Sequence, residues 1–276
     1  MHLSPAGYRM SLHDDLRGII PDNILHHLTR HFEVIGDIAI LSLRPELNDY
    51  KKQIAEGIIS HRKNISTVLN KVSKIEGEHR TAYYEILAGT RTLTCHHEYG
   101  FLYRFDIGKV FFNSRLGFER KRVTDQVQPD ELVLVPFCGV GPFAIPAAAR
   151  HARVIAIEKN PDACHWLSDN ISINGVTQNV CIINGNAFDI CLRPHKKFDR
   201  AIIPTPYGRD AILRVIAPLV KKSGMIHFYT FKKWHQVPFL IEEYEKKGFH
   251  VNFFRSCGNV APNVSRWVFD LIKSGP

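Results

Sequence analysis

The sequence predicts an α/β protein in which a smaller α+β domain precedes a doubly wound, mostly parallel sheet. Two observations lead to this fold class. From residue 131 onward, short apolar runs alternate with helical patterns, which is the βαβ arrangement of parallel sheets. Before residue 128, several segments alternate polar and apolar residues, as antiparallel strands do. Because 276 residues suffice for two ordinary domains, we place one domain in residues 1–128 and the other in residues 129–276.

In the first domain, residues 34–41 read as a strand pair or a bulged strand, and residues 46–61 as a helix. An antiparallel sheet is then predicted by alternating segments at 83–87, 93–97, 102–106 and 109–112.

In the second domain, seven apolar runs predict seven strands, at 132–135, 154–157, 180–183, 200–203, 225–231, 251–254 and 264–271. Helices are expected at 142–150, 161–174, 210–221 and 237–247. Pro161 begins the second of these helices, and Asn174-Gly175 ends it.

Charge is concentrated in one part of the chain. The 36 Lys and Arg against 27 Asp and Glu give a net charge of +9, and the pI is about 9.3. Residues 51–122 hold 14 of the basic and 7 of the acidic side chains, so this quarter of the chain carries +7. Such an excess favours a polyanionic partner such as nucleic acid. Solubility alone is the alternative explanation.

Other classes of protein are disfavoured. No apolar run approaches the roughly 20 residues of a membrane span, and the amino terminus lacks a secretory signal pattern. The six cysteines form no C-x-x-C pair, and His26-His27 and His96-His97 lack ligand spacing, so we expect no metal site and no disulfide framework. We expect a cytoplasmic protein with reduced thiols and no membrane association.

A nucleotide-cofactor site is predicted where the strand at 132–135 runs into Gly139-Val140-Gly141 and then a helix. Glu158, seventeen residues beyond Gly141, ends the next strand and can accept hydrogen bonds from both ribose hydroxyls. Ala144-Ile145 stands where a dinucleotide fingerprint needs its third glycine, which favours S-adenosylmethionine over NAD. A tight turn beside a surface glutamate is the alternative.

Several linked motifs resemble one enzyme family. They are residues 97–100, 110–120, 137–148, 157–161, 199–203 and 261–264, together with Asp106, Trp166-Leu167, Asn170 and Asn174. The chain resembles, over residues 32–273, the archaeal and eukaryotic tRNA guanine-37 N1-methyltransferases and their relatives, the wybutosine-pathway aminocarboxypropyltransferases. The resemblance implies a class I methyltransferase fold, Rossmann-like, with S-adenosylmethionine as cofactor and tRNA as substrate.

The resemblance and the glycine turn together predict the cofactor-binding residues, which are Phe137, Cys138, Gly139, Val140, Gly141, Pro142, Phe143, Glu158, Lys159, Asn186, Ala187, Pro204 and Pro206. Three positions depart from the family pattern. Pro136 and Asn186 stand where the family usually has acids. Pro204-Thr205-Pro206 stands where the methyltransferases have an Asn-Leu-Pro turn, so only Pro206 matches the family pattern there.

The resemblance also implies catalytic residues. Removing the N1 proton of a guanine requires a base, and a carboxylate can serve. Glu119 matches the family's general base, and Arg115, four residues earlier, can stabilise charge on the purine oxygen. Arg80 matches a second arginine of the site. The alternative for Glu119 and Arg115 is an ordinary surface ion pair.

We therefore expect a monomeric tRNA methyltransferase that modifies N1 of a guanine of the position-37 type. Aminocarboxypropyl transfer from the same cofactor is the first alternative, favoured by Pro204 and by a short segment before Phe32. A non-catalytic RNA-binding protein that retains the fold is the second. Trp166 and Trp234 are expected in the core or in a pocket wall rather than as stacking platforms.

Overall fold

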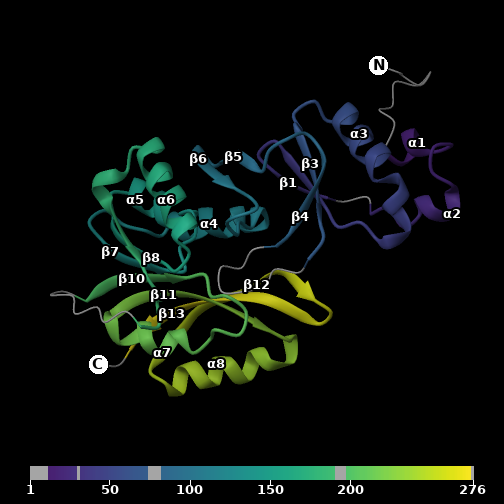
Figure 1. Ribbon diagram of the computed structural model, residues 1–276. Helices are drawn as coiled ribbons and strands as arrows, with labels where there is room; N and C mark the ends of the chain where they lie inside the picture. The colour runs from purple at the N-terminus through teal and green to yellow at the C-terminus, as the bar shows by residue number, and fades with distance from the viewer. Residues whose placement is uncertain (1–11, 30–31, 74–81, 190–196, 275–276) are drawn as a thin grey trace, which may run out of the picture. The chain divides into compact units, whose positions relative to one another are not determined.

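The structure is a computed structural model that describes residues 12–29, 32–73, 82–189 and 197–274 (Figure 1). The chain divides into two compact units. Unit 1 consists of Met1–His97 and Arg104–Ser114, and unit 2 consists of Glu98–Tyr103 and Arg115–Pro276. The units thus divide earlier in the chain than residue 128, and all the described residues of the predicted sites lie in unit 2.

Unit 1 is built on a four-stranded mixed sheet in the order β1-β2-β3-β4, in which only β2 and β3 run parallel. Its elements are α1 (Leu12–Leu16), α2 (Asp22–Leu25), β1 (Glu33–Ile35), β2 (Ile38–Leu41), the 3-10 helix η1 (Pro45–Tyr50), α3 (Lys51–His61), β3 (Thr67–Lys71) and β4 (Tyr84–Ala88). Ile54, Ile58 and Leu47 bury one face of the predicted helix against Val68 of β3. This apolar contact holds the helix on the sheet.

Two predictions for the first half of the chain were wrong. Strand β3 was missed because its first four residues are all buried, so the segment shows no alternation. No strand forms at 109–112, because the amides of Lys109 and Val110 both bond the carbonyl of Asp106 in a turn. Strands β5 (Leu93–Glu98) and β6 (Phe101–Asp106) do not join the sheet of unit 1 but pair with each other.

Unit 2 contains the predicted seven-stranded sheet, in the order β12-β13-β11-β10-β7-β8-β9. The strands are β7 (Leu132–Pro136), β8 (Arg153–Glu158), β9 (Val180–Asn184), β10 (Phe198–Ile203), β11 (Val220–Lys232), β12 (Phe249–Ala261) and β13 (Val264–Lys273). The five strands from β11 to β9 run parallel, and β13 runs antiparallel to both its neighbours. The α/β fold class is therefore confirmed.

Helices cover both faces of this sheet, as a doubly wound fold requires (Figure 1). They are α4 (Gly117–Thr124), α5 (Ala144–Ala149), α6 (Pro161–Ile173), α7 (Ile212–Ile216) and α8 (Val237–Lys246), with short 3-10 turns η2 (Ser114–Leu116), η3 (Thr177–Asn179), η4 (Ala217–Leu219) and η5 (Trp234–Gln236). The helix predicted at 210–221 is shorter, because a 3-10 turn begins at Ala217 and β11 begins at Val220.

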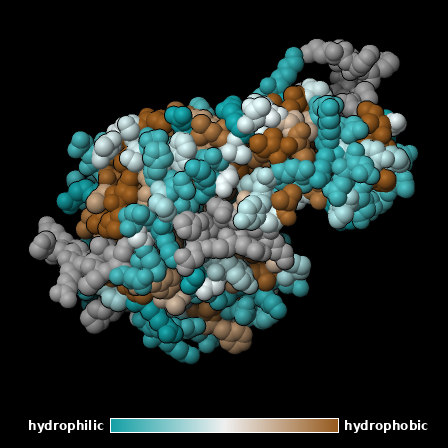
Figure 2. All heavy atoms as spheres, in the orientation of Figure 1, coloured by the Kyte–Doolittle hydropathy of each residue, from teal (hydrophilic) through white to brown (hydrophobic). Residues whose placement is uncertain are grey.

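The order of the strands fixes where a ligand can bind. Chain order reverses between β7 and β10, which lie side by side although they are far apart in sequence. In open α/β sheets the crevice at the carboxyl ends of such strands is the binding site. None of the described helices is long and apolar enough to cross a bilayer. Hydrophobic side chains on the face shown in Figure 2 are interspersed with hydrophilic ones over α8 and the neighbouring strands.

Candidate functional site

The predicted glycine turn lies at the carboxyl end of β7, beside the crevice between β7 and β10 where the chain order reverses. Its backbone adopts positive φ at Phe137 (56°), Gly139 (56°) and Gly141 (95°). A Cβ on Gly141 would lie 2.5 Å from the Leu167 Cδ1 atom, so only glycine lets the turn pack this closely against α6. The buried Asn170 side chain donates to the Val140 carbonyl at 3.2 Å and fixes the turn from the same helix. At Gly139 and Gly141 no side chain stands between the backbone and a ligand in the crevice.

Glu158 ends β8 next to this turn. Its two carboxylate oxygens accept hydrogen bonds from the backbone N–H groups of Gly139 and Asn160, each at 2.9 Å. These bonds fix the carboxylate between the glycine turn and the start of α6. Because each oxygen has a second lone pair, the carboxylate can still accept both hydroxyls of a ribose. The geometry therefore fits an adenosine-type cofactor.

The remaining predicted cofactor residues surround the same edge of the sheet. Asn186 stabilises its own turn, because its side chain donates to Asp189 at 2.7 Å and accepts from the Phe188 amide at 3.2 Å. The rings of Phe188 and Phe137 lie 6.2 Å apart and can form an apolar wall. Ala187 is buried and Lys159 is exposed. Pro204 and Pro206 flank the buried Thr205 directly after β10.

Cys138, inside the turn, is buried. Burial and the nearby negative charge of Glu158 raise the pKa of its thiol well above the ordinary value. The thiol is therefore neutral near pH 7, and Cys138 packs as a small apolar residue rather than acting as a nucleophile.

Glu119, the predicted base, lies on α4 with only 2% of its surface exposed. Its Oε2 atom accepts hydrogen bonds from Arg122 Nε at 3.0 Å and from the Tyr229 hydroxyl at 3.3 Å. Arg255 Nε lies 3.0 Å from Oε1, but off the direction of a hydrogen bond, and Oε1 accepts none from the described residues. The two guanidinium groups offset the cost of burying this carboxyl group, and one of its oxygens stays available.

One aromatic residue connects Glu119 to the cofactor turn. Tyr229 donates to Glu119, and its ring lies 5.6 Å from the ring of Phe143, at the end of the glycine turn. Burial and the charge of Glu119 raise the pKa of Tyr229 well above the ordinary value, so its hydroxyl remains a donor. The structure therefore brings the predicted base and the predicted cofactor turn against the same side chain.

The two predicted arginines are placed differently. Arg115 is exposed and lies in the 3-10 turn before α4, so the helix that carries Glu119 begins only after it. Arg80 lies outside the described residues. The partners described for Glu119 are Arg122, Arg255 and Tyr229, none of which was among the predicted site residues.

Beyond Glu119, a chain of buried polar groups crosses the sheet. Arg122 donates to both oxygens of Asp270 at 2.5 and 3.1 Å, and Asp270 bonds His227 Nδ1 at 2.7 Å. His227 Nε2 lies 2.7 Å from Arg200 Nη1, and Arg200 also donates twice to Glu131. An arginine can only donate, so Nε2 accepts and the proton of a neutral His227 is on Nδ1.

The pKa values in this chain of groups agree with that proton placement. Burial lowers the pKa of His227 below its ordinary value, which keeps the imidazole neutral. Burial alone would raise the pKa of Asp270, but the hydrogen bond from His227 and the Arg122 guanidinium hold it well below the ordinary value. The signal in the sequence was a charged or ionisable residue among the apolar residues of three strands, Arg200, His227 and Asp270.

Comparisons with known proteins identify the family of the chain. The family profile described as the TRM5/TYW2 methyltransferase domain matches residues 94–248, which is more than half of the chain. The profile of the TYW2 N-terminal domain matches residues 12–92.

Two curated archaeal relatives align over most of the chain. The tRNA (guanine(37)-N(1))-methyltransferase Trm5b of Pyrococcus abyssi is 38% identical over 213 residues, which cover 77% of this chain and 63% of that protein. The tRNA(Phe) (4-demethylwyosine(37)-C(7)) aminocarboxypropyltransferase of Pyrococcus horikoshii is 37% identical over 226 residues, which cover 81% of this chain and 80% of that protein. The chain therefore spans less than two thirds of the length of the first relative.

Solved structures show the same architecture. The complex of aTrm5 with tRNALeu has a TM-score of 0.84 at 29% identity and covers 95% of this chain and 78% of that chain. P. horikoshii TYW2 in complex with MeSAdo has a TM-score of 0.77 at 29% identity and covers 95% of this chain and 98% of that chain. The resemblance seen in the sequence is confirmed, and the chain belongs to the TRM5/TYW2 methyltransferase family.

Proposed function

We propose that this protein is an S-adenosylmethionine-dependent tRNA methyltransferase that modifies N1 of guanine 37. The observation that carries the proposal is the contact of one side chain, Tyr229, with both Glu119 and the glycine turn. This side chain connects a buried carboxyl group with the turn that we propose to bind the cofactor. Family membership supports the same reaction class.

The residues of the crevice would hold the cofactor by its adenosine half. Glu158 would accept the ribose hydroxyls, and the Gly139–Gly141 backbone would lie against the ligand without side chains in the way. Phe137 and Phe188 would pack on the adenine. When bound, S-adenosylmethionine supplies an electrophilic methyl group on its sulfonium.

The residues around Glu119 would manage the proton. A guanine N1 loses its proton as the methyl group arrives. Oε1 of Glu119, which accepts no hydrogen bond from the described part of the chain, is the oxygen that would take it. Access to this oxygen requires a side chain to move. Arg255 is the most exposed of its partners, at 37%, and its displacement would open the way. Arg115 would then stabilise negative charge on the purine O6 atom.

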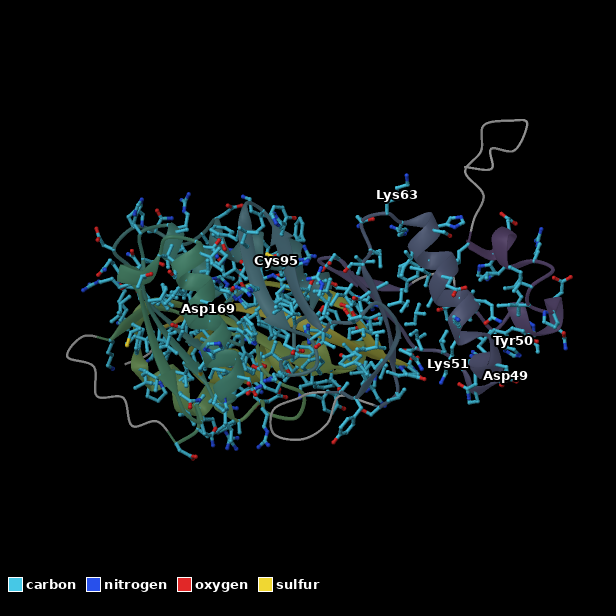
Figure 3. The ribbon with its side chains drawn as sticks, turned by 45° about the horizontal axis from the view of Figure 1, so that its top comes forward. Asp49, Tyr50, Lys51, Lys63, Cys95 and Asp169 are labelled. Atoms are coloured by element: carbon cyan, nitrogen blue, oxygen red, sulfur yellow. The ribbon has the colours of Figure 1, made fainter. Side chains whose placement is uncertain are left out.

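Unit 1 would hold the RNA through its basic side chains. Lys52, Arg62, Lys63, Arg91, Arg104 and Lys109 are all exposed. Lys51 and Lys63, at opposite ends of α3, are labelled in Figure 3. Lys51 is paired with Glu85 at 2.8 Å, whereas Lys63 follows the helix end in solvent. Exposed cations can bind phosphates regardless of sequence, which suits a domain that positions tRNA.

A second candidate is aminocarboxypropyl transfer from the same cofactor. The match of residues 12–92 to the TYW2 N-terminal domain favours it, as does the coverage of the P. horikoshii aminocarboxypropyltransferase along 80% of its length. Pro204, which stands where the methyltransferases have Asn, points the same way. In this reaction Glu119 would still take a proton from the purine.

One experiment separates these candidates. The protein is incubated either with unmodified tRNA transcripts or with tRNA(Phe) that carries 4-demethylwyosine at position 37, the base named for the P. horikoshii relative. The S-adenosylmethionine is labelled in its methyl group or in its carboxyl group, and the nucleosides are analysed by mass spectrometry. Methyl label in 1-methylguanosine is the expected result. Carboxyl label in the tRNA would establish the second candidate. Binding of tRNA and cofactor with no label transferred would indicate an RNA-binding protein without turnover.

A further inference from the structure

We propose that Tyr207, backed by Phe231 and Arg266, is the platform on which the target base stacks during transfer. This inference rests on the proposed RNA substrate and names the part of it that this surface binds. It holds for either transferred group, because both reactions need a purine held in place at the cofactor.

Tyr207 is largely exposed to solvent, although large aromatic side chains are mostly buried in proteins. It lies in the loop after β10, directly after Pro206, and 67% of its surface is accessible. This loop is at the carboxyl end of β10, next to β7 and the glycine turn. The ring is thus presented at the edge of the sheet where the cofactor site lies.

The ring of Tyr207 is supported from behind. It lies 5.3 Å from the ring of Phe231, and the Arg266 guanidinium lies 4.8 Å from the centre of that ring. Phe231 and Arg266 are opposite each other on β11 and β13, and Arg266 is buried. A ring braced in this way loses little freedom when a base stacks on its open face.

The platform shares a face of the sheet with the predicted base. Side chains alternate along a strand, so Phe231 points to the same side of β11 as Tyr229, about 7 Å away. Tyr229 is the residue that donates to Glu119. A purine stacked on Tyr207 would therefore lie on the side of the sheet that carries Tyr229 and Glu119.

Unpaired bases are the occupant that this surface fits. Sequence-specific RNA recognition targets loop bases splayed onto aromatic side chains, and nearby cations bind the flanking phosphates. Arg209 and Lys233 are both exposed, and they follow Tyr207 and Phe231, respectively, by two residues in the chain. An anticodon-loop purine matches both the aromatic and the cationic parts.

Trp234 provides a matched control. It is exposed by 73% and lies at the same edge, but its ring packs on Trp267, whose partner on β11 is Thr230 rather than Phe231. Trp267 therefore lies on the opposite face of the sheet from the platform.

The test uses an anticodon stem–loop RNA with 2-aminopurine in place of guanine 37, and its fluorescence is titrated with each protein. We expect Tyr207→Ala to bind about 5- to 100-fold more weakly than the wild type, which is the usual effect of losing one stacked base. The affinity of Tyr207→Phe should stay within about twofold of the wild type, because the aromatic ring is kept. The affinity of Trp234→Ala should also stay within about twofold, because Trp234 packs on the opposite face of the sheet from Tyr207. Cofactor binding by calorimetry confirms that each variant is folded.

Wild-type affinity in Tyr207→Ala, with quenching of the probe unchanged, would overturn the stacking and leave the proposed function intact. So would an equal loss in Tyr207→Phe, since the hydroxyl rather than the ring would then be responsible. A wild-type protein that does not bind the stem–loop would overturn the proposed RNA substrate and this inference with it.

Discussion

Unit 1 and unit 2 carry their charged side chains in different ways. In unit 1 the ion pairs lie at the surface, as in Lys51–Glu85 and Arg91–Asp37, and several cations stay in solvent. In unit 2 the side chains of the pairs Arg122–Asp270 and Arg200–Glu131 are at most 16% exposed, and Glu119 is buried beside Arg122. In these pairs the same residue types face water in unit 1 and the protein interior in unit 2, which in addition has pairs in solvent such as Lys121–Asp125.

The difference indicates two kinds of use. Exposed charges are screened by salt and contribute little to stability, but they attract a polyanion over a distance. Buried charges are costly unless each has a partner, and their protonation states are fixed by their neighbours. We infer that unit 1 uses charge to bind RNA and that unit 2 uses it to set proton positions.

The largest effect is expected from breaking the buried chain of groups at its centre. Asp270→Ala leaves Arg122 and His227 without their shared partner, so we expect a loss of about 3–5 kcal/mol in the free energy of unfolding. Asp125→Ala is the matched control, since Asp125 also pairs with a cation of α4, Lys121, but in solvent. Denaturant titration should show a change of at most about 1 kcal/mol there. Equal losses in both variants would contradict the distinction.

The next effect concerns the cofactor. Glu158→Ala removes the carboxylate that would receive the ribose, and we expect S-adenosylmethionine affinity to fall by about 1.5–3 kcal/mol, or roughly 10- to 150-fold. Asp162→Ala, which removes the next acid in the chain, should leave the affinity nearly unchanged. Calorimetry measures both. Wild-type affinity in Glu158→Ala would show that the ribose binds elsewhere.

A smaller effect should appear as pH falls. The folded protein lowers the pKa of His227, so protonation favours the unfolded chain once the pH drops below the ordinary value of 6.5. We expect the slope of stability against pH to be steeper in the wild type than in His227→Gln, by at most about 1.4 kcal/mol per pH unit. Chemical denaturation between pH 7.5 and 5, as a rough range, tests this difference. Identical slopes would mean that the pKa of His227 is the same in the folded and the unfolded chain, against the account given above.

The smallest effect on stability is expected in unit 1. Replacing Arg62 and Lys63 by Ala should leave the free energy of unfolding nearly unchanged, because both side chains are exposed. The slope of log affinity for tRNA against log salt should become shallower by about one for each phosphate that the variant no longer neutralises. Lys246→Ala on α8, an exposed cation of unit 2, is the control and should leave the slope as it is. An unchanged slope in the double variant would remove these two cations from the RNA site.

Much of unit 2 could be predicted from the sequence, for a physical reason. Its inner strands, such as β7 and β10, are buried on both faces, so they read as apolar runs, and Gly141 and Pro161 mark the turns between elements. The glycine turn and Glu158 could be found from the sequence because each depends on local residues. A cofactor site needs glycines after one strand and an acid at the end of the next.

The surroundings of Glu119 could not be predicted in the same way. Arg255 and Tyr229 reach it from strands more than 100 residues further along the chain, and only the register of β11, β13 and β12 brings them together. Trp234 was expected in the core or a pocket wall, but it lies in a 3-10 turn and is largely exposed. Apolar character alone does not distinguish a buried ring from one at the surface.

The central claim is that the buried carboxylate of Glu119 is the base, and Glu119→Gln tests it most directly. The variant keeps the size and hydrogen bonding of the side chain but not its basicity. We predict nearly unchanged affinity for S-adenosylmethionine and tRNA, with a single-turnover rate of transfer about 10²–10⁴-fold lower. Arg115→Lys, measured alongside, should also slow transfer because it loses the planar fork. A normal single-turnover rate in Glu119→Gln would contradict the account and place the base on another residue.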